Sequence, residues 1–102
     1  MKKEQLMQDE VQSQIYSDVL ERLILHLQQR TDVQNIDLMN LSGFCRNCLS
    51  KWYVAAAEKK GMKIDYEEAR EIIYGMPYSE WKNKYQTEVT RKQLNQWNKD
   101  RS

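Results

Sequence analysis

The stretch EQLMQDEVQSQIYSDVLERLILHLQQR, residues 4–30, decides the fold class. Its apolar residues recur every four positions from Met7 to Leu27, and a second row from Tyr16 to Ile24 runs beside the first. This spacing predicts one long α-helix. Because a row with a period of four drifts by about 40° per step around a helix, the apolar stripe covers more than one side. The helix therefore needs neighbours on two sides, and we expect a second copy of the chain to supply one of them.

The rest of the chain divides into shorter segments with helical periodicity. We expect helices near residues 31–40, 43–60, 65–75 and 77–85. Their boundary signals are the capping-box pairs Thr31–Gln34 and Asp65–Glu68, the breaks at Ser42–Gly43, Gly61 and Gly75, and Pro77 at a helix start. The polar extension, residues 86–102, is expected either to dock loosely as a helix or to fray.

Length and composition favour a single helical domain over residues 1–102. Hydrophobic residues make up 40% and charged residues 30% of the chain, which is enough for one modest core. Three glycines and one proline are too few for a turn-rich all-β fold, and the common residues favour helix. We predict an all-α single domain of four to six helices, working as a homodimer in which Leu25 or Val11 is buried against the second chain.

Charge and hydropathy predict a cytoplasmic protein. The N-terminal lysines precede no apolar core of a signal peptide, and no run approaches the roughly 20 apolar residues that span a bilayer. The net charge of +1 gives no global attraction for nucleic acid or membrane. Residues 1–41 hold four basic and seven acidic residues (−3), and residues 42–102 hold twelve and eight (+4). The two parts can therefore attract one another, within a chain or across a dimer.

The motif CRNC, residues 45–48, allows three interpretations. A helical projection places Cys45, Cys48 and Trp52 within one apolar arc, with Arg46 and Ser50 outside it. The favoured interpretation is that both cysteines are reduced thiols that pack as small hydrophobic residues on the buried face of this helix. The second is thiol-redox chemistry, since a helix start lowers a thiol pKa, but the βαβ pattern of thioredoxin-like proteins is missing.

The third interpretation of the motif is a metal site. Cys45 and Cys48 supply two ligands, and His26, the only histidine, is a candidate for a third. A closed zinc site needs about four ligands, so two chains would have to combine their motifs to complete one. We therefore expect no resident cofactor, with zinc on these residues as the alternative.

The sequence indicates catalysis and nucleic-acid binding more weakly than it indicates a role for the CRNC motif. His26 has no local serine or cysteine partner, and there is no glycine-rich phosphate loop, so the balance favours a non-enzymatic protein. Residues 82–102 hold six basic and two acidic residues, with Trp81, Tyr85 and Trp97 interleaved. Single-stranded nucleic-acid binders use this combination, and so do ordinary docking helices.

A longer signature carries a family resemblance. It consists of ERLILHLQQRTDVQNIDLMNLSGFCRNCLSKWY, residues 21–53, followed by EAREIIYGMPYSEWK, residues 68–82. Over about residues 16–85 the chain resembles a family of short proteobacterial proteins catalogued as domain of unknown function twelve-forty-four. The resemblance implies an all-helical fold and an intertwined homodimer, and it implies no established activity. Carried over by position, the family's characteristic residues are His26, Arg30, Thr31, Asp32, Asn35, Asp37, Asn40, Cys45, Arg46, Asn47 and Cys48.

This polar set is denser than packing alone requires, so we expect a functional site in it. The leading expectation is a non-enzymatic interaction or regulatory module with an unidentified protein partner. The alternatives are a metal or thiol-redox site on Cys45 and Cys48, and nucleic-acid binding through the basic C-terminal segment.

Overall fold

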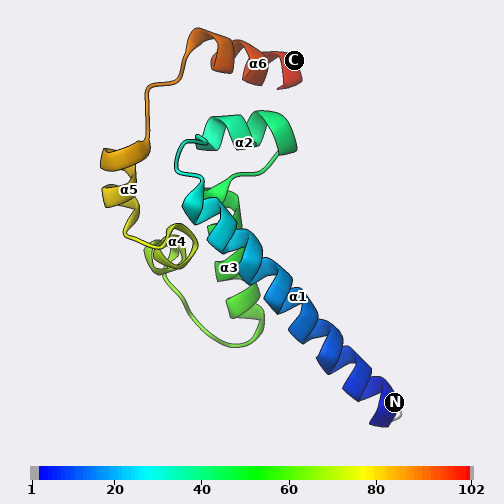
Figure 1. Cartoon of the computed structure of the whole chain (residues 1–102). Helices are drawn as coiled ribbons and strands as arrows, with labels where there is room; N and C mark the ends of the chain where they lie inside the picture. The colour runs from blue at the N-terminus through cyan, green and yellow to red at the C-terminus, as the bar shows by residue number, and fades with distance from the viewer. Residues whose placement is uncertain (1–2, 102) are drawn as a thin grey trace.

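A computed structural model describes residues 3–101 of the chain. This part of the chain contains six α-helices (Figure 1). In chain order they are α1 (Lys3–Gln29), α2 (Asn35–Ser42), α3 (Arg46–Lys59), α4 (Tyr66–Tyr74), α5 (Tyr78–Tyr85) and α6 (Arg91–Arg101). All regular secondary structure in this range is helical, which confirms the predicted all-α single domain. None of the helices within residues 3–101 is long and apolar enough to cross a lipid bilayer.

The long helix α1 projects from the body as an arm (Figure 1). Only its C-terminal end packs against other helices, with Leu27 buried and Ile24 half-buried. From Met7 to Leu23 every residue is exposed. The two apolar rows of the arm therefore face solvent over most of their length, although the sequence predicts neighbours on two sides.

The core lies where α1, α3 and α4 meet. Each of these helices contributes one residue to its buried centre: Leu27, Leu49 and Ile73, respectively. Partly buried Ile24, Leu38 and Phe44 pack around that centre. Ala69 of α4 is fully buried as well, which fits the close packing of α4 against α3. α4 is the central helix, because it contacts α1, α3 and α5.

Aromatic side chains join α5 to α4. Trp81 is 1% exposed and packs edge-on against Tyr74, with ring centroids 5.1 Å apart. Tyr85 also contacts Trp81, at a centroid distance of 5.8 Å. Aromatic residues bury about 150–250 Å² each, so Trp81 makes a large contribution to this small body.

Gly75 lies where the end of α1 contacts the end of α4. This glycine ends α4 with a φ of +77°, a conformation that residues with a Cβ rarely adopt. Gln28 of α1 lies over it and donates its Nε2 to the carbonyl oxygens of Ile72 at 3.3 Å and Ile73 at 3.2 Å. These bonds satisfy carbonyl groups that a helix end leaves unpaired. A Cβ at position 75 would lie 2.9 Å from the Cδ of Gln28, so the end of that flexible side chain would have to shift, and the positive φ is the main reason for glycine here.

The buried face of α3 differs from the predicted one. Arg46 and Ser50 were expected outside the apolar arc, but they are 1% and 0% exposed, whereas Trp52 is 57% exposed. Arg46 can be buried because its guanidinium reaches acceptors on neighbouring segments, and the Ser50 hydroxyl donates to the Arg46 carbonyl oxygen at 2.9 Å. The helix also begins at Arg46 rather than Gly43, so Cys45 is its N-cap residue. α3 is therefore rotated relative to the prediction.

The ends of the helices follow the predicted signals, with small shifts. The left-handed glycines lie at the expected breaks, Gly43, Gly61 and Gly75. The cap of α2 forms three residues later than the predicted Thr31–Gln34 pair, since Gln34 is the N-cap and its N–H donates to Asp37 Oδ2 at 3.3 Å. Asp65 is the N-cap of α4 but makes no side-chain capping bond, and Pro77 precedes α5 as its N-cap.

The polar C-terminal extension forms α6, which docks on α2 (Figure 1). Thr90 and Gln93 cap its start reciprocally: the Gln93 N–H donates to Thr90 Oγ1 at 3.1 Å, and the Thr90 N–H donates to Gln93 Oε1 at 2.8 Å. Gln93 also donates its Nε2 to Asp37 Oδ1 at 2.8 Å, and its carbonyl oxygen accepts from Asn40 Nδ2 at 3.1 Å. Of the two alternatives for this segment, the docked helix is observed; Ser102 lies outside the described residues.

We expect a chain that ends at Thr87 to keep its core. The truncation removes α6 and its contacts with α2, but it keeps the Thr87 N–H that Gln34 Oε1 accepts at 3.0 Å. Thermal unfolding followed by far-ultraviolet circular dichroism should stay cooperative. The helical signal should fall by no more than the part that α6 contributes to it. Disappearance of the cooperative transition would show that the extension belongs to the core.

Candidate functional site

The centre of the candidate site is the guanidinium of Arg46, the first residue of α3. Its Nη1 donates to Asn35 Oδ1 at 3.0 Å, and its Nη2 donates to the Arg30 carbonyl oxygen at 2.9 Å. The guanidinium also lies over the ring of Trp81, 4.8 Å from the centroid. Burial lowers the pKa of Arg46, but an arginine side chain stays protonated in proteins. A full positive charge is therefore held inside the body by two neutral oxygens and a ring face.

A chain of hydrogen bonds continues from Arg46 to α4. Asn35 Nδ2 donates to the Tyr74 hydroxyl oxygen at 2.9 Å, and that hydroxyl donates to Asn47 Oδ1 at 2.7 Å. Arg70 Nε donates to the same Asn47 oxygen at 3.2 Å. Burial raises the pKa of Tyr74, which keeps the phenol protonated and able to donate. We call these five side chains the Arg46 network; it joins α2, α3 and α4.

Arg70 forms the outer end of the Arg46 network, between two aromatic rings. Its guanidinium carbon lies 3.7 Å from the centroid of the Tyr78 ring and 4.6 Å from that of the Tyr66 ring. Its Nη1 also pairs with Glu67 Oε1 at 2.9 Å. Stacking and pairing together hold Arg70 in one orientation, so it is positioned for the network rather than free to bind a ligand.

A hollow beside the Arg46 network is small and its polar groups are already bonded. It measures about 190 Å³ and is lined in part by Gln34, Asn35, Asn47 and Tyr78. Ligand pockets usually measure about 300–1,000 Å³. Both Asn35 and Asn47 already bond within the network. This arrangement fits a structural role for the network.

The two cysteines lie next to Arg46 as free thiols. Cys45 is buried and Cys48 half-buried, and their Sγ atoms are 3.9 Å apart. Cys48 Sγ is also 3.9 Å from the Sδ of Met39, on α2. Burial raises the pKa of Cys45, against the lowering effect of the nearby backbone N–H groups of Cys48 and Asn47. Cys45 is buried, as expected, while Cys48 keeps partial contact with solvent.

The remaining predicted residues lie outside this centre. Arg30 and Asp32 form a surface ion pair, with Arg30 Nε and Nη2 each 3.0 Å from an Asp32 oxygen, and the hydrogen bond from Arg30 lowers the pKa of Asp32. Asp37 and Asn40 bond to α6, and Asn40 Oδ1 is buried without a hydrogen-bond partner among the described residues. His26 is exposed in the last turn of α1.

The predicted polar set is therefore divided among several roles. Asn35, Arg46 and Asn47 come together in the Arg46 network, while Cys45 and Cys48 form a separate thiol pair. Among residues 3–101, no three His, Cys, Asp or Glu side chains gather closely enough to hold a metal ion. The predicted ligand set of both cysteines and the histidine is thus not assembled within the described part of one chain.

Sequence reasoning missed Gln34, Arg70 and Tyr74 as members of the site. Gln34 is buried and bonds to the backbone on both sides of Gln86: its Nε2 donates to the Tyr85 carbonyl oxygen at 2.9 Å, and its Oε1 accepts from the Thr87 N–H at 3.0 Å. Its place in a predicted capping pair was the only signal available. The roles of these side chains depend on partners more than 20 residues away in sequence.

A comparison with protein families gives a clear match. The family described as "Protein of unknown function (DUF1244)" matches residues 33–99, well over half of the chain. The chain belongs to this family. The match spans α2 to α6 and so contains the cysteine pair and all five residues of the Arg46 network, whereas it begins after α1. Compared with the resemblance over about residues 16–85, it starts later and includes most of α6. No curated protein matches the chain.

We expect Arg46→Lys to destabilise the fold. A lysine cannot reach both oxygens with the fixed fork of a guanidinium, so one buried acceptor loses its donor. An unsatisfied buried group costs about 1–3 kcal/mol, and the free energy of unfolding should fall by about this amount. Urea denaturation measures the change. Arg30→Lys is the control, because that side chain makes only a surface ion pair; equal loss in both variants would contradict the role given to Arg46.

We expect the two thiols to react at different rates at neutral pH. Cys45 is buried with a raised pKa, so its thiolate fraction at neutral pH is smaller than that of a free cysteine and grows only at alkaline pH. Alkylation of the native protein, read by peptide mass spectrometry, should modify Cys48 first and Cys45 only with unfolding. Cys45→Ser and Cys48→Ser identify each signal. Rapid alkylation of Cys45 at neutral pH would contradict the packing role.

Proposed function

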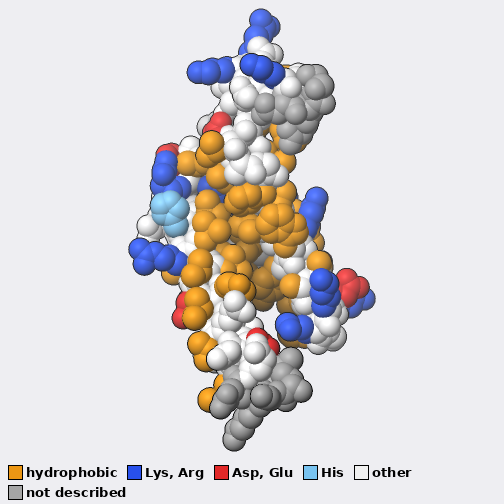
Figure 2. All heavy atoms as spheres, turned by 90° about the vertical axis from the view of Figure 1, so that its right-hand side faces the viewer, with side chains coloured by type: hydrophobic (Ala, Val, Ile, Leu, Met, Phe, Trp, Pro, Cys, Tyr) orange, Lys and Arg blue, Asp and Glu red, His pale blue; other side chains and the backbone are white. Residues whose placement is uncertain are grey.

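We propose that the chain is a non-enzymatic interaction module whose working form is a homodimer. The observation that carries the proposal is the apolar surface that one chain leaves uncovered. On α1 the exposed apolar side chains are Met7, Val11, Ile15, Tyr16, Val19, Leu20, Leu23 and Leu25, and on α3 Trp52 is exposed as well. Figure 2 shows hydrophobic side chains gathered at mid-height of one face and continuing down the arm. Large exposed patches of this kind mark interaction sites in soluble proteins.

The excess surface area matches what a stable dimer hides. The chain exposes 8097 Å², whereas a compact protein of 12.3 kDa exposes about 6,100 Å². The excess is about 2,000 Å² per chain and so about 4,000 Å² for two chains, which falls within the range of about 2,000–5,000 Å² that obligate homodimer interfaces hide in total. The radius of gyration, 16.7 Å, likewise exceeds the value of about 13 Å for a compact domain of this length.

The distribution of charge favours a second copy of this chain as the partner. Residues 1–41 have a net charge of −3, and residues 42–102 one of +4. The N-terminal end of α1 and the basic segment at α6 lie at opposite ends of the molecule, so they cannot attract one another within one chain (Figure 1). A two-fold axis would bring the acidic arm of each chain toward the basic end of the other, which supports an intertwined arrangement.

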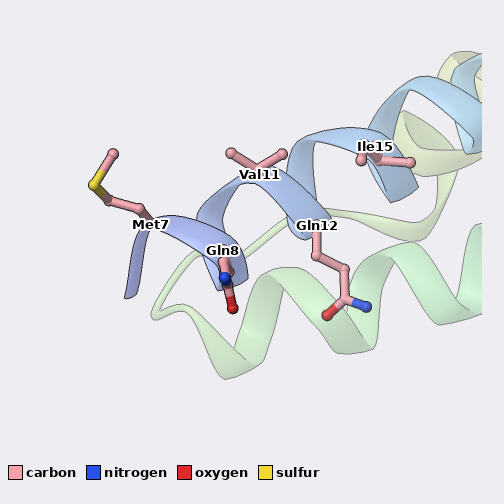
Figure 3. A pocket seen from close by; sticks show the side chains of 5 residues that line it. All are labelled: Met7, Gln8, Val11, Gln12 and Ile15. Carbon is pink, nitrogen blue, oxygen red and sulfur yellow. The ribbon is translucent and has the colours of Figure 1, made fainter. Parts of the chain in front are cut away.

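The spacing of the apolar residues indicates how two arms would meet. Figure 3 shows Met7, Val11 and Ile15 along one side of α1, while Gln8 and Gln12 project from another. Rows with a spacing of four residues form ridges, and two such ridges interlock when helices cross at about −50°. A coiled coil needs alternating spacings of four and three sustained over several heptads, and on the exposed arm that pattern occurs only between Tyr16 and Leu23. We therefore expect the arms to cross rather than to run alongside one another.

The proposal includes a cytoplasmic location, a reducing compartment that would keep Cys45 and Cys48 as thiols. Nucleic-acid binding through the basic C-terminal segment has less support. Trp81 is buried against Tyr74 and Tyr85, so it is not available to stack on bases. The apolar side chains of the arm, in contrast, are exposed and can contact a protein.

Sedimentation at micromolar concentration tests the dimer. We expect a species of about twice the chain mass of 12.3 kDa. Val19→Glu should weaken self-association by at least about tenfold, since it would bury a charge in an apolar interface. Val19 is 63% exposed in one chain, so the variant should still fold.

Ser17→Glu is the matched control, because it adds the same charge on the opposite side of α1 and should leave self-association unchanged. A wild-type monomer would overturn the proposal. So would a Val19→Glu dimer as tight as the wild type.

A further inference from the structure

Cys48 Sγ has two sulfur neighbours at the start of α3. Cys45 precedes the helix as its N-cap, and Cys48 lies in its first turn, so their Sγ atoms face each other at 3.9 Å. The turn at Gly43 folds α2 back so that Met39 Sδ lies 3.9 Å from Cys48 Sγ. Met39 and Cys48 are only half-buried, which leaves a route from solvent to the group. We call Cys45, Cys48 and Met39 the sulfur cluster.

The spacing of the sulfur cluster suits a single ion. An ion about 2.3 Å from two sulfur atoms that are 3.9 Å apart makes a sulfur–ion–sulfur angle of about 116°, close to trigonal. Both measured separations have this value, and Cys48 is common to the two pairs. Each of these two pairs can therefore share one ion at its present separation, and a three-coordinate site requires Met39 Sδ and Cys45 Sγ to lie at a similar separation from each other.

The surrounding charge suits a complex of two thiolates. Two thiolates, one thioether and a monovalent cation carry a net charge of −1. The buried guanidinium of Arg46 lies between the cysteines in sequence and is close enough to Cys45 to interact with its charge. Its two hydrogen bonds go to neutral oxygens, so its positive charge is available to balance the complex. The N-terminus of α3 adds a further positive potential.

We propose that Cys45, Cys48 and Met39 bind one Cu(I) ion per chain. Thiolate and thioether sulfur are the ligands that soft Cu(I) prefers, whereas zinc sites use thiolate, imidazole or carboxylate and usually four ligands. On binding, each cysteine thiol releases one proton to solvent, and the copper keeps its oxidation state. The site is independent of the proposed dimer, since all three ligands come from one chain.

Anaerobic titration with Cu(I) against a coloured Cu(I) chelator tests the site. The wild type should take one Cu(I) per chain from the chelator, with thiolate-to-copper absorption in the ultraviolet and release of two protons in weakly buffered solution. Met39→Leu keeps the volume but removes the thioether, and it should weaken binding by about tenfold or more. Met76→Leu, a half-buried methionine elsewhere, is the matched control and should bind like the wild type.

Cys45→Ser and Cys48→Ser should each abolish the absorption band while circular dichroism shows a folded chain. Three results would overturn the proposal: the chelator keeps all the Cu(I) in the presence of wild type, Met39→Leu binds as tightly as wild type, or the metal binds at one ion per two chains. The last result would indicate a four-cysteine site between chains, and titration with Co(II) would then give the spectrum of a tetrahedral thiolate complex.

Discussion

The buried charge of Arg46 constrains the rest of the body. A guanidinium can leave water only if acceptors meet its N–H groups, and here they come from the Arg30 carbonyl and the Asn35 side chain. Both acceptors must converge on one rigid fork, so the connection between α1 and α2 has little freedom in how it runs. Trp81 covers the guanidinium from α5. One side chain therefore connects the end of α1, α2, α3 and α5.

Internal hydrogen bonding accounts for much of the polar density around the CRNC motif. Asn35 uses both ends of its amide, accepting from Arg46 and donating to Tyr74, and Asn47 accepts from Tyr74 and Arg70. Such a network holds its members in fixed positions, because leaving one unpaired costs more than forming the bond gains. The parts of the molecule that the fold does not use in this way are the sulfur cluster and the apolar arm, and both proposals rest on these parts.

Local signals in the sequence predicted the helices. The features that could not be predicted, such as the buried face of α3, depend on tertiary contacts. The i+4 rows of α1 and the glycines at positions 43, 61 and 75 act within a few residues, so α1 and the ends of α2, α3 and α4 could be read from the sequence. The buried face of α3 could not, because a projection counts arginine and serine as polar. Arg46 is buried only because acceptors 11 and 16 residues away reach it.

The same limit applies to the candidate site. The cysteine pair was recognisable as a motif, and its spacing in the structure agrees with a free, packed pair. The proximity of Met39 to Cys48 was not recognisable, because it depends on the turn between α2 and α3. Likewise, Gln34 has partners at residues 85 and 87, which no local pattern associates with it.

The contact between Gly75 and Gln28 also limits which residues the two positions tolerate. A side chain at position 75 would collide with Gln28, and the backbone there has a φ of +77°. A shorter residue at position 28 would make room, but it would give up the bonds to the carbonyls of Ile72 and Ile73. Gly75 therefore tolerates a side chain poorly because of its backbone conformation, and a side chain there would also displace the end of the Gln28 side chain that bonds to α4. A substitution at one position thus changes which residues fit at the other, although the two lie 47 residues apart in the chain.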